Sequence, residues 1–291
     1  MAEIEDIKGR ALMKRSGSVD SLQFALPIKA TTDFQVVEGL QEEALALSTL
    51  WQGERPTVIP MVPDELTTDN FYGHSSVQDA ISQGEVPLGL DLETVDAVMW
   101  KHRKSSFLYL VDDERLMIQF TEQVANVSRL ENRYLLVIAS EHHQLPSNLG
   151  CEVLSDQDSI SEMLEALEQK ISERLESNRR QFVATLIFYD MVNLVEELDK
   201  ASLERLSYIL EKGYQVGYCS MVLSDATITK KIDVASKVVR SSKEGLLGIR
   251  LSDQNLFNVM NKPIKEGQLD NQVHYYISDN QAYKIKVLMG D

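Results

Sequence analysis

Cysteine and clustered histidine are scarce in this sequence of 291 residues. It has two cysteines, Cys151 and Cys219, which lie far apart and outside any CxxC spacing, and one close pair among its five histidines. A structural zinc site needs four ligands at short spacings, which no stretch of the sequence offers. We therefore expect no metal site, and we expect the two thiols to behave as small buried side chains of a reducing compartment.

The sequence also lacks long apolar runs and has fewer basic than acidic residues. No run approaches the ~20 residues that span a bilayer, and the N-terminus has no apolar signal-peptide core. The 29 lysines and arginines are outnumbered by 45 aspartates and glutamates, which gives a formal charge of −16. Because nucleic-acid binding depends on cations that neutralise phosphates, we expect no direct nucleic-acid partner. The sequence predicts a soluble globular chain, which could still be the soluble part of a membrane protein.

Apolar strands that alternate with amphipathic helices fill most of the chain, of which 43% is hydrophobic. Strands are predicted at residues 85–92, 95–102, 105–111, 133–140, 181–190, 218–223 and 245–251. Helices are predicted at residues 32–51, 113–132, 159–177, 202–212 and 229–241. Strands without polar alternation are typical of a parallel sheet covered on both faces, so the predicted fold class is α/β.

The two ends of the chain predict antiparallel hairpins. Residues 274–278 and 281–289 flank the two-residue turn Asp279-Asn280, which predicts a hairpin at the edge of the sheet. Residues 9–14 and 21–28 flank a polar turn, which predicts a second hairpin.

Domain boundaries follow from these hairpins and from a polar stretch near residue 70. We expect residues 1–30 to form an N-terminal hairpin at the junction with a preceding domain, and residues 31–291 to form one domain. A short strand is predicted at residues 57–60, and residues 63–84 predict a linker or subdomain junction with a short helix at 77–82.

The carboxyl ends of the predicted strands are the places to search for a ligand site. After the strand FLYLV, a phosphate-binding loop would need glycines, a lysine and a hydroxyl residue. The chain instead has Asp112, Asp113, Glu114 and Arg115 at that position. Three successive carboxylates would repel a triphosphate. We interpret Asp112 or Asp113 as the N-cap of the next helix and Glu114 as an acid that favours its positive end.

Three further strand ends carry polar residues. Asp190 closes an apolar strand in the manner of a Walker B aspartate, but Met191 follows where a second acid is usual, and we expect Asp190 to cap the next helix. Ser224 and Asp225 follow another strand, where they could sense a phosphate, but we interpret them as caps of the following segment. His142 and His143 follow a third strand, without a local serine or cysteine partner, and we expect an exposed loop pair.

Several stretches together resemble an FtsK/SpoIIIE-type ATPase domain. The run VPLGLDLETVDAVMWKHRKSSFLYLVDDERL is similar to the entry of such a domain, GRALMK and SLQFALPI resemble a junction between two of them, and GLLGIRLSDQNLFN resembles its closing strands. The resemblance implies a RecA-like P-loop-NTPase core, with a mostly parallel central sheet flanked by helices and antiparallel edge hairpins. Met1-Ala2 before a strand of this kind suggests a piece of a longer protein.

Within this family, the chain looks like the last, C-terminal ATPase-like domain of a type VII secretion motor of Gram-positive bacteria. The resemblance places the phosphate-loop position at Asp112 to Arg115 and the Walker B position at Asp190. The family's glycines, lysine and hydroxyl are absent there, and Ser224-Asp225-Ala226 stands near an expected Gln-Arg-Pro trio. These departures predict a degenerate nucleotide site with no bound cofactor.

The resemblance also implies partners and a location. It implies secreted helical-hairpin (WXG100-like) proteins as partners, together with neighbouring ATPase domains in a hexameric motor at the cytoplasmic side of the plasma membrane. A pseudo-ATPase that recognises substrates and regulates export is the first hypothesis. The alternative is an ATP-binding or ATP-hydrolysing domain, with a non-standard pocket near Asp190 or a site completed in trans. A scaffold repeat that only packs in an oligomer is a third possibility.

Overall fold

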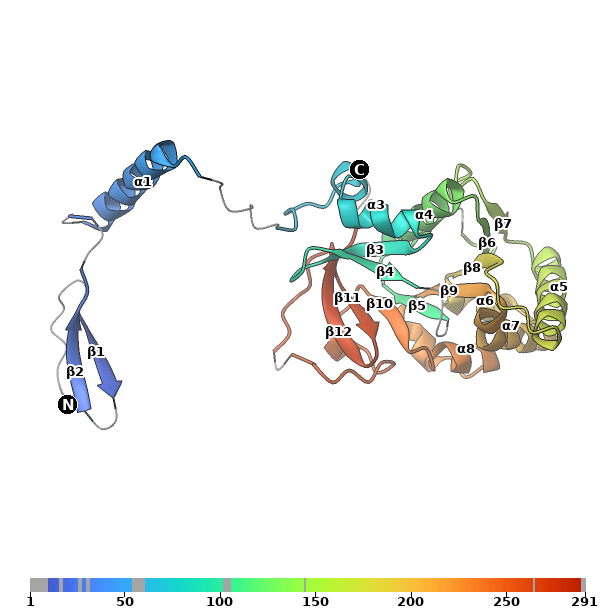
Figure 1. The fold of residues 1–291 in the computed structure, drawn as a ribbon. Helices are drawn as coiled ribbons and strands as arrows, with labels where there is room; N and C mark the ends of the chain where they lie inside the picture. The colour runs from blue at the N-terminus through green and yellow to red at the C-terminus, as the bar shows by residue number, and fades with distance from the viewer. Residues whose placement is uncertain are drawn as a thin grey trace. The chain divides into compact units, whose positions relative to one another are not determined.

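The chain is described here by a computed structural model, which covers residues 10–15, 18–25, 28–29, 32–53, 61–101, 106–143, 145–263 and 265–288. Its contacts divide the chain into two compact units, Met1–Ile59 and Pro60–Asp291 (Figure 1). The strand predicted at residues 57–60 lies outside the described residues. The candidate site lies wholly in the second unit.

The first unit consists of a hairpin and one helix. Strands β1 (Arg10–Arg15) and β2 (Ser18–Gln23) pair in antiparallel register, with Met13 opposite Asp20. Helix α1 (Asp33–Leu50) is capped by Thr32, whose hydroxyl accepts from the Gln35 amide at 3.3 Å. The predicted hairpin and helix are therefore present. The contacts within the chain place α1 in the same unit as the hairpin. The sequence instead predicted a domain boundary after residue 30, and that division stays a prediction.

A ten-stranded sheet forms the centre of the second unit. Its strands are β3 (Val86–Asp91), β4 (Ala97–Trp100), β5 (Phe107–Leu110), β6 (Tyr134–Ala139), β7 (Glu152–Leu154), β8 (Ala184–Tyr189), β9 (Tyr218–Ser224), β10 (Glu244–Leu247), β11 (Val273–Ser278) and β12 (Gln281–Lys286). They lie in the order β4-β3-β12-β11-β10-β5-β9-β8-β6-β7. The six strands from β10 to β7 are parallel to one another, which confirms the predicted mostly parallel sheet.

Two antiparallel hairpins make up the other end of this sheet. The hairpin β11–β12 turns through Asp279 and Asn280, which have positive φ angles of 50° and 63°, as a tight two-residue turn requires. The hairpin β11–β12 lies between β10 and the hairpin β3–β4, so β4 forms the edge of the sheet. The predicted C-terminal hairpin is therefore present, but its predicted place at the edge was wrong.

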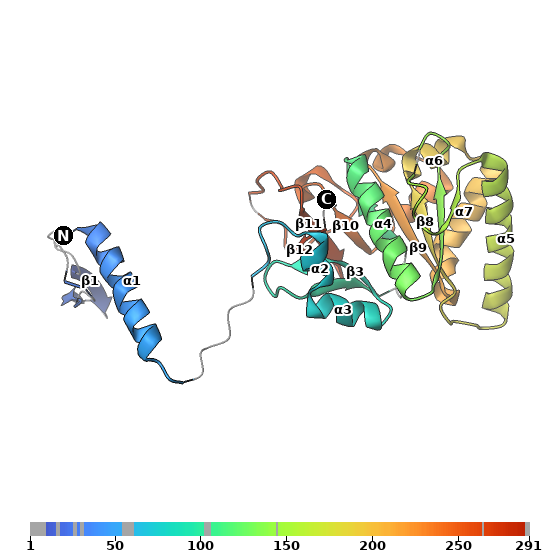
Figure 2. The same cartoon turned by 90° about the horizontal axis from the view of Figure 1, so that it is seen from above.

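Helices cover both faces of the sheet, as Figure 1 shows in side view and Figure 2 from above. They are α2 (Thr68–Tyr72), α3 (Ser75–Ser82), α4 (Glu114–Leu130), α5 (Gln157–Glu176), α6 (Met191–Glu197), α7 (Lys200–Lys212) and α8 (Val234–Val239), with 3-10 turns η1 (Gly213–Val216), η2 (Ala226–Lys230) and η3 (Leu251–Asp253). On β5, Leu108 and Leu110 belong to the core under α5 to α8, whereas Phe107 and Tyr109 belong to the core under α4. This double burial is the cause of the strands' continuous apolar character.

Three helices and strands of the described residues were not predicted from the sequence, namely α2, β7 and α6. Strand β7 has only three residues, and its alternation is too short to recognise. Helix α6 begins at Met191, directly after Asp190, so no polar linker separates it from β8. The single helix predicted at residues 229–241 is instead the turn η2 followed by the short helix α8.

Candidate nucleotide site

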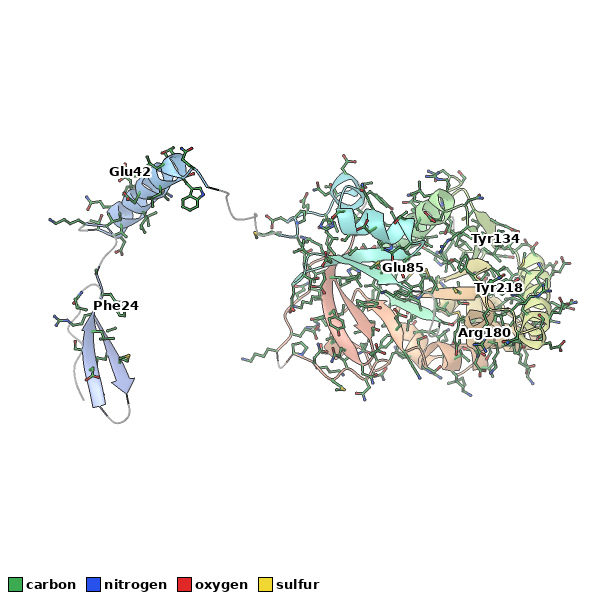
Figure 3. The ribbon with its side chains drawn as sticks, viewed as in Figure 1. Phe24, Glu42, Glu85, Tyr134, Arg180 and Tyr218 are labelled. Atoms are coloured by element: carbon green, nitrogen blue, oxygen red, sulfur yellow. The ribbon has the colours of Figure 1, made fainter. Side chains whose placement is uncertain are left out.

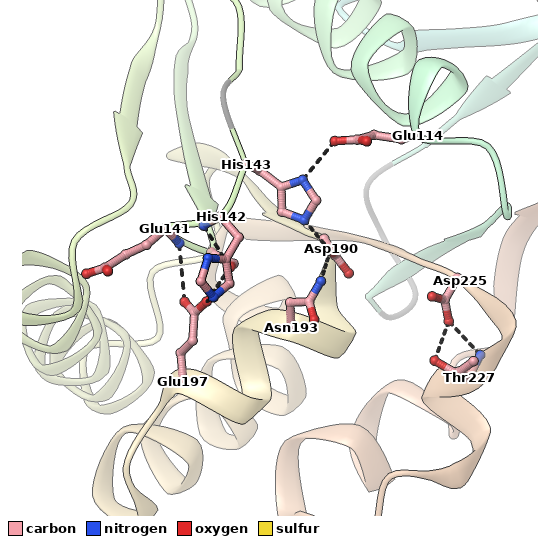
Figure 4. Close-up of polar contacts among 10 residues, drawn as sticks. Glu114, Glu141, His142, His143, Asp190, Asn193, Glu197, Asp225 and Thr227 are labelled. Carbon is pink, nitrogen blue, oxygen red and sulfur yellow. Dashed lines mark hydrogen bonds and ion pairs between the residues drawn. The ribbon is translucent and has the colours of Figure 1, made fainter.

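The parallel strands bring four polar segments to one edge of the sheet. Residues 112–115 follow β5, residues 140–143 follow β6, Asp190 follows β8, and Asp225 follows β9 (Figure 4). Every strand-end position that the sequence singled out therefore lies at this edge. A nucleotide-binding protein of this class would hold its phosphates and magnesium here.

The turn after β5 is closed by its own side chains. Only residues 111–113 separate β5 from α4, and Asp113 caps the helix by accepting from the Arg115 amide at 3.0 Å. The Arg115 guanidinium donates to both Asp113 oxygens, at 3.1 and 2.7 Å, and this pairing lowers the pKa of the Asp113 carboxyl. Asp112 accepts from the Ala226 amide at 3.3 Å. The predicted capping role is confirmed for Asp113.

Asp190 does not cap α6, so that prediction was wrong. Its backbone is left-handed, with φ 48° and ψ 65°, whereas the residues whose side chains cap helices here have extended backbones. The Asp190 carboxylate instead accepts from His143 Nε2 and from Asn193 Nδ2, the latter at 2.5 Å. The carboxylate at the Walker B position is therefore already hydrogen-bonded to other side chains of the protein.

His143 was expected to lie exposed beside His142, and this expectation was wrong. The His142 side chain is 78% exposed, but the His143 side chain is only 16% exposed. His143 Nδ1 lies 2.8 Å from Glu114 Oε1 while its Nε2 contacts Asp190 (Figure 4). An imidazole that faces two carboxylates through both nitrogens must be protonated to donate to both. His143 is thus a cation that joins the phosphate-loop position to the Walker B position.

The charge on His143 is supported by its surroundings. Burial acts to lower its pKa, but the hydrogen bonds to Glu114 and Asp190 outweigh burial, so the pKa lies above the ordinary value of 6.5. The Tyr189 ring packs edge-on against the imidazole, with centroids 5.4 Å apart. A raised folded-state pKa means that the bridge stabilises the fold fully below about pH 6.5 and ceases to do so as the pH rises through that pKa.

We expect this titration to be visible by NMR of the histidine rings. The His143 midpoint should lie above the ordinary value of 6.5, and Asp190→Asn should lower it because a neutral amide no longer favours the imidazolium. Glu114→Gln should act in the same direction. A His143 midpoint that neither substitution moves would contradict the bridge.

A second cluster at the edge shows no nucleophile and base pair. Glu197 accepts from the Ser140 hydroxyl and from the Glu141 amide, the latter at 3.3 Å, and lies 3.6 Å from His142 Nε2. The Ser140 hydroxyl therefore donates to a carboxylate, and no histidine is placed to take its proton. The cluster holds the loop after β6 in place.

A hollow of about 420 Å³ beside the turn after β5 is strongly acidic. Its ten lining residues include Asp112, Asp113, Glu114 and Asp270, and none of the ten is a lysine or arginine. Asp225, as predicted, caps η2 by accepting from the Thr227 amide at 2.6 Å. The capping role predicted for Ser224 was wrong, because Ser224 ends β9 and its hydroxyl donates to the Asp225 carbonyl. Within the residues that the structure describes, no group of three or more His, Cys, Asp or Glu could hold a metal ion. The carboxylates around this hollow carry the same sign of charge as the phosphates of a nucleotide.

Comparisons with known proteins show what this chain is similar to. No protein-family model matches the chain. Over 97% of its length it is 25% identical to the type VII secretion system protein EssC of Staphylococcus aureus strain Mu50, of which it spans only 19%. Among the described residues, no helix is long and apolar enough to cross a membrane.

Solved structures agree over the whole chain. EssC (ATPases 2 and 3) from Geobacillus thermodenitrificans gives a TM-score of 0.72 at 18% identity, covering 100% of this chain and 57% of that one. The cytoplasmic domain of EssC gives 0.68 at 18% identity over 99% and 60%, and Thermomonospora curvata EccC (ATPases 2 and 3) in complex with a signal sequence peptide gives 0.61 at 15% over 99% and 54%. The chain thus has the P-loop ATPase fold of type VII secretion motors, and its predicted resemblance to an FtsK/SpoIIIE-type ATPase domain of EssC is confirmed.

Proposed function

We propose that this chain is a nucleotide-hydrolysis-deficient ATPase-like domain of a type VII secretion motor, which recognises substrates and regulates their export. The observation that carries the proposal is the His143 bridge between Glu114 and Asp190. It fills the place where a working site would hold the terminal phosphate and the metal, and it uses the carboxylate that would bind that metal. No cofactor is needed by such a domain.

Two features of the turn after β5 favour the same conclusion. The helix begins without glycines whose amides could wrap phosphates, and its Arg115 amide already donates to the Asp113 cap. The neighbouring hollow is acidic, so an arginine supplied by another subunit would find carboxylates and no phosphate. These features favour the pseudo-ATPase over an active domain completed in trans.

Protein partners are the corresponding proposal for binding. One structural neighbour, EccC, carries a signal sequence peptide. By analogy we propose that this chain binds secreted helical-hairpin (WXG100-like) proteins of a Gram-positive bacterium, beside neighbouring ATPase domains of a hexameric motor. Its place would be the cytoplasmic side of the plasma membrane. The net charge of −16 argues against direct nucleic-acid binding.

The test is binding of secreted helical-hairpin proteins, and of synthetic peptides of their terminal segments, to the full chain. We expect at least one of these to bind with a Kd on the order of micromolar, and ATP with magnesium to leave this affinity unchanged within about twofold. The same titrations are repeated with the Asp190→Asn variant, which keeps a polar side chain at the site, as the matched control. Binding that requires ATP would favour the active-domain alternative, and failure of every partner would favour the scaffold repeat.

A further inference from the structure

A second pocket, of about 730 Å³, lies at the opposite edge of the sheet from the candidate nucleotide site. Its lining residues include Arg133, Phe182 and Gly217, which precede β6, β8 and β9. Figure 3 labels two others, Glu85 and Arg180. The volume falls within the range of small-molecule sites, roughly 300–1,000 Å³. No residue of the candidate nucleotide site lines it.

The pocket is basic in an acidic chain. Among the described residues that line it, Lys101, Arg133 and Arg180 are basic and Glu85 is acidic. Within the described residues, none of the three cations forms an ion pair with a carboxylate, although Arg180 Nε donates to Asn178 at 3.1 Å. The negative charge of Glu85 balances one of the three positive charges. Two positive charges of these lining residues are therefore left without a balancing carboxylate. An anionic ligand would neutralise them.

Arg133 is held in its position by a glycine and an aromatic ring. Its Nη1 donates to the Gly84 carbonyl, and its guanidinium lies 4.8 Å from the centroid of the Phe182 ring. Gly84 has φ +70°, and a Cβ there would overlap the guanidinium. Gly84 therefore leaves the space that Arg133 occupies, and the arginine is oriented before any ligand arrives.

Two adjacent loops at the pocket are joined by Arg174. Arg174 donates from Nε to the Val216 carbonyl at 2.9 Å and from Nη2 to the Gln181 carbonyl at 2.8 Å. Gly217, with φ +91°, allows its backbone to pass against that of Gln181. The loops before β8 and β9 are thus fixed, so the pocket is formed in the free protein.

Glu85 favours a ligand that carries a hydrogen-bond donor. Its Oε2 is buried and has no hydrogen-bond partner in the described part of the chain. Because Glu85 lines the pocket, a hydroxyl or amino group on a ligand can donate to its carboxylate.

We propose that this pocket binds a phosphate monoester that also carries a hydroxyl or amino group, such as a sugar phosphate or a nucleoside monophosphate. A phosphate monoester carries about −2 at pH 7, which matches the excess charge of the pocket, whereas one carboxylate would leave a positive charge unpaired. The phosphate contacts Lys101, Arg133 and Arg180, and the hydroxyl or amino group donates to Glu85. This inference is independent of the proposed function, since it concerns the other edge of the sheet.

The experiment is calorimetric titration of the full chain with ribose 5-phosphate, adenosine monophosphate and inorganic phosphate. We expect at least one monoester to bind more tightly than inorganic phosphate. Lys101→Gln with Arg180→Gln should weaken monoester binding about tenfold or more, because two charged contacts are lost. Both side chains are exposed, so the fold should be unaffected. The matched control, Lys170→Gln with Lys262→Gln, removes the same charge from exposed positions outside the pocket and should change binding less than about twofold.

Glu85→Gln separates the role of the donor from that of charge. It should weaken the preference for the monoesters over inorganic phosphate, because an uncharged amide accepts a weaker hydrogen bond while inorganic phosphate loses a repulsive neighbour. No binding by any of the three compounds at about 10 mM would overturn the proposal. So would monoester binding that survives the double substitution, or that is lost in His143→Gln at the opposite edge.

Discussion

Replacing Asp190 by alanine is expected to lower the free energy of unfolding by about 3 kcal/mol. Asp190 is 7% exposed, and its carboxylate is the shared acceptor of His143 and Asn193. The substitution leaves a largely buried imidazolium with one partner and an amide with none. It also puts alanine at φ 48°, which adds strain that aspartate and asparagine tolerate better. A residue kept for metal binding would show a much smaller loss.

Urea unfolding of the full chain measures this loss, with Asp190→Asn as the matched control. Asparagine keeps the left-handed backbone and a hydrogen-bond acceptor, so its cost should be roughly half as large. In a double-mutant cycle with His143→Ala, the two substitutions should be less than additive by about 1 kcal/mol or more. Strictly additive costs would mean that the two side chains do not interact, and would contradict the bridge.

Acidification from about pH 6.5 to pH 4 is expected to remove about 3 kcal/mol of stability through His274 alone. Its side chain is 1% exposed, with Nε2 3.0 Å from the Tyr109 hydroxyl, and burial lowers its pKa from 6.5 to about 4. Between those two values the unfolded chain binds a proton that the folded chain does not. The free energy of unfolding must therefore fall as the pH falls through this window.

His274→Gln isolates this contribution. The variant should lose some stability at neutral pH, because its fit against Tyr109 changes, but the slope of stability against pH between about 4 and 6.5 should become shallower by one proton. The unfolding free energies of both proteins, measured by urea at several pH values, give this slope directly. Identical slopes would show that His274 is not held neutral. The His143 bridge acts in the opposite sense, since it is lost as the pH rises.

Much of the fold follows from local patterns in the sequence. The apolar runs at β5, β6, β8 and β9 and the amphipathic stripes of α4 and α5 are each long enough to specify one element. The turn at Asp279-Asn280 specifies its hairpin by the positive φ that these residues tolerate. The order of the strands in the sheet does not follow from local patterns, because the pairing of β12 with β3 joins segments almost two hundred residues apart.

The candidate site was predictable in its positions but not in its contacts. Asp113 as a helix cap depends only on neighbours in sequence, and it was predicted. His143 meets Glu114 and Asp190 across separations of 29 and 47 residues, which depends on how far the loop after β6 reaches. One signal was available in the sequence: a histidine pair follows one strand, and acids follow two other strands whose carboxyl ends lie at the same edge of a parallel sheet.

The departures from a working ATPase site thus form one arrangement. Carboxylates stand at the phosphate-loop position and at the end of β8, and the His143 imidazole contacts one of each. Under the proposed function, a scaffold stabilised in this way would need no nucleotide to keep its shape.

Equilibrium titration of the full chain with labelled ATP and magnesium tests this account most directly. The account predicts no saturable binding at the carboxyl edge up to about 1 mM ATP. Any weak signal should be unchanged by Asp190→Asn and His143→Gln, and should be lost in the Lys101→Gln and Arg180→Gln variant if it comes from the pocket at the other edge. Micromolar binding that Asp190→Ala abolishes would contradict the account and restore an active nucleotide site.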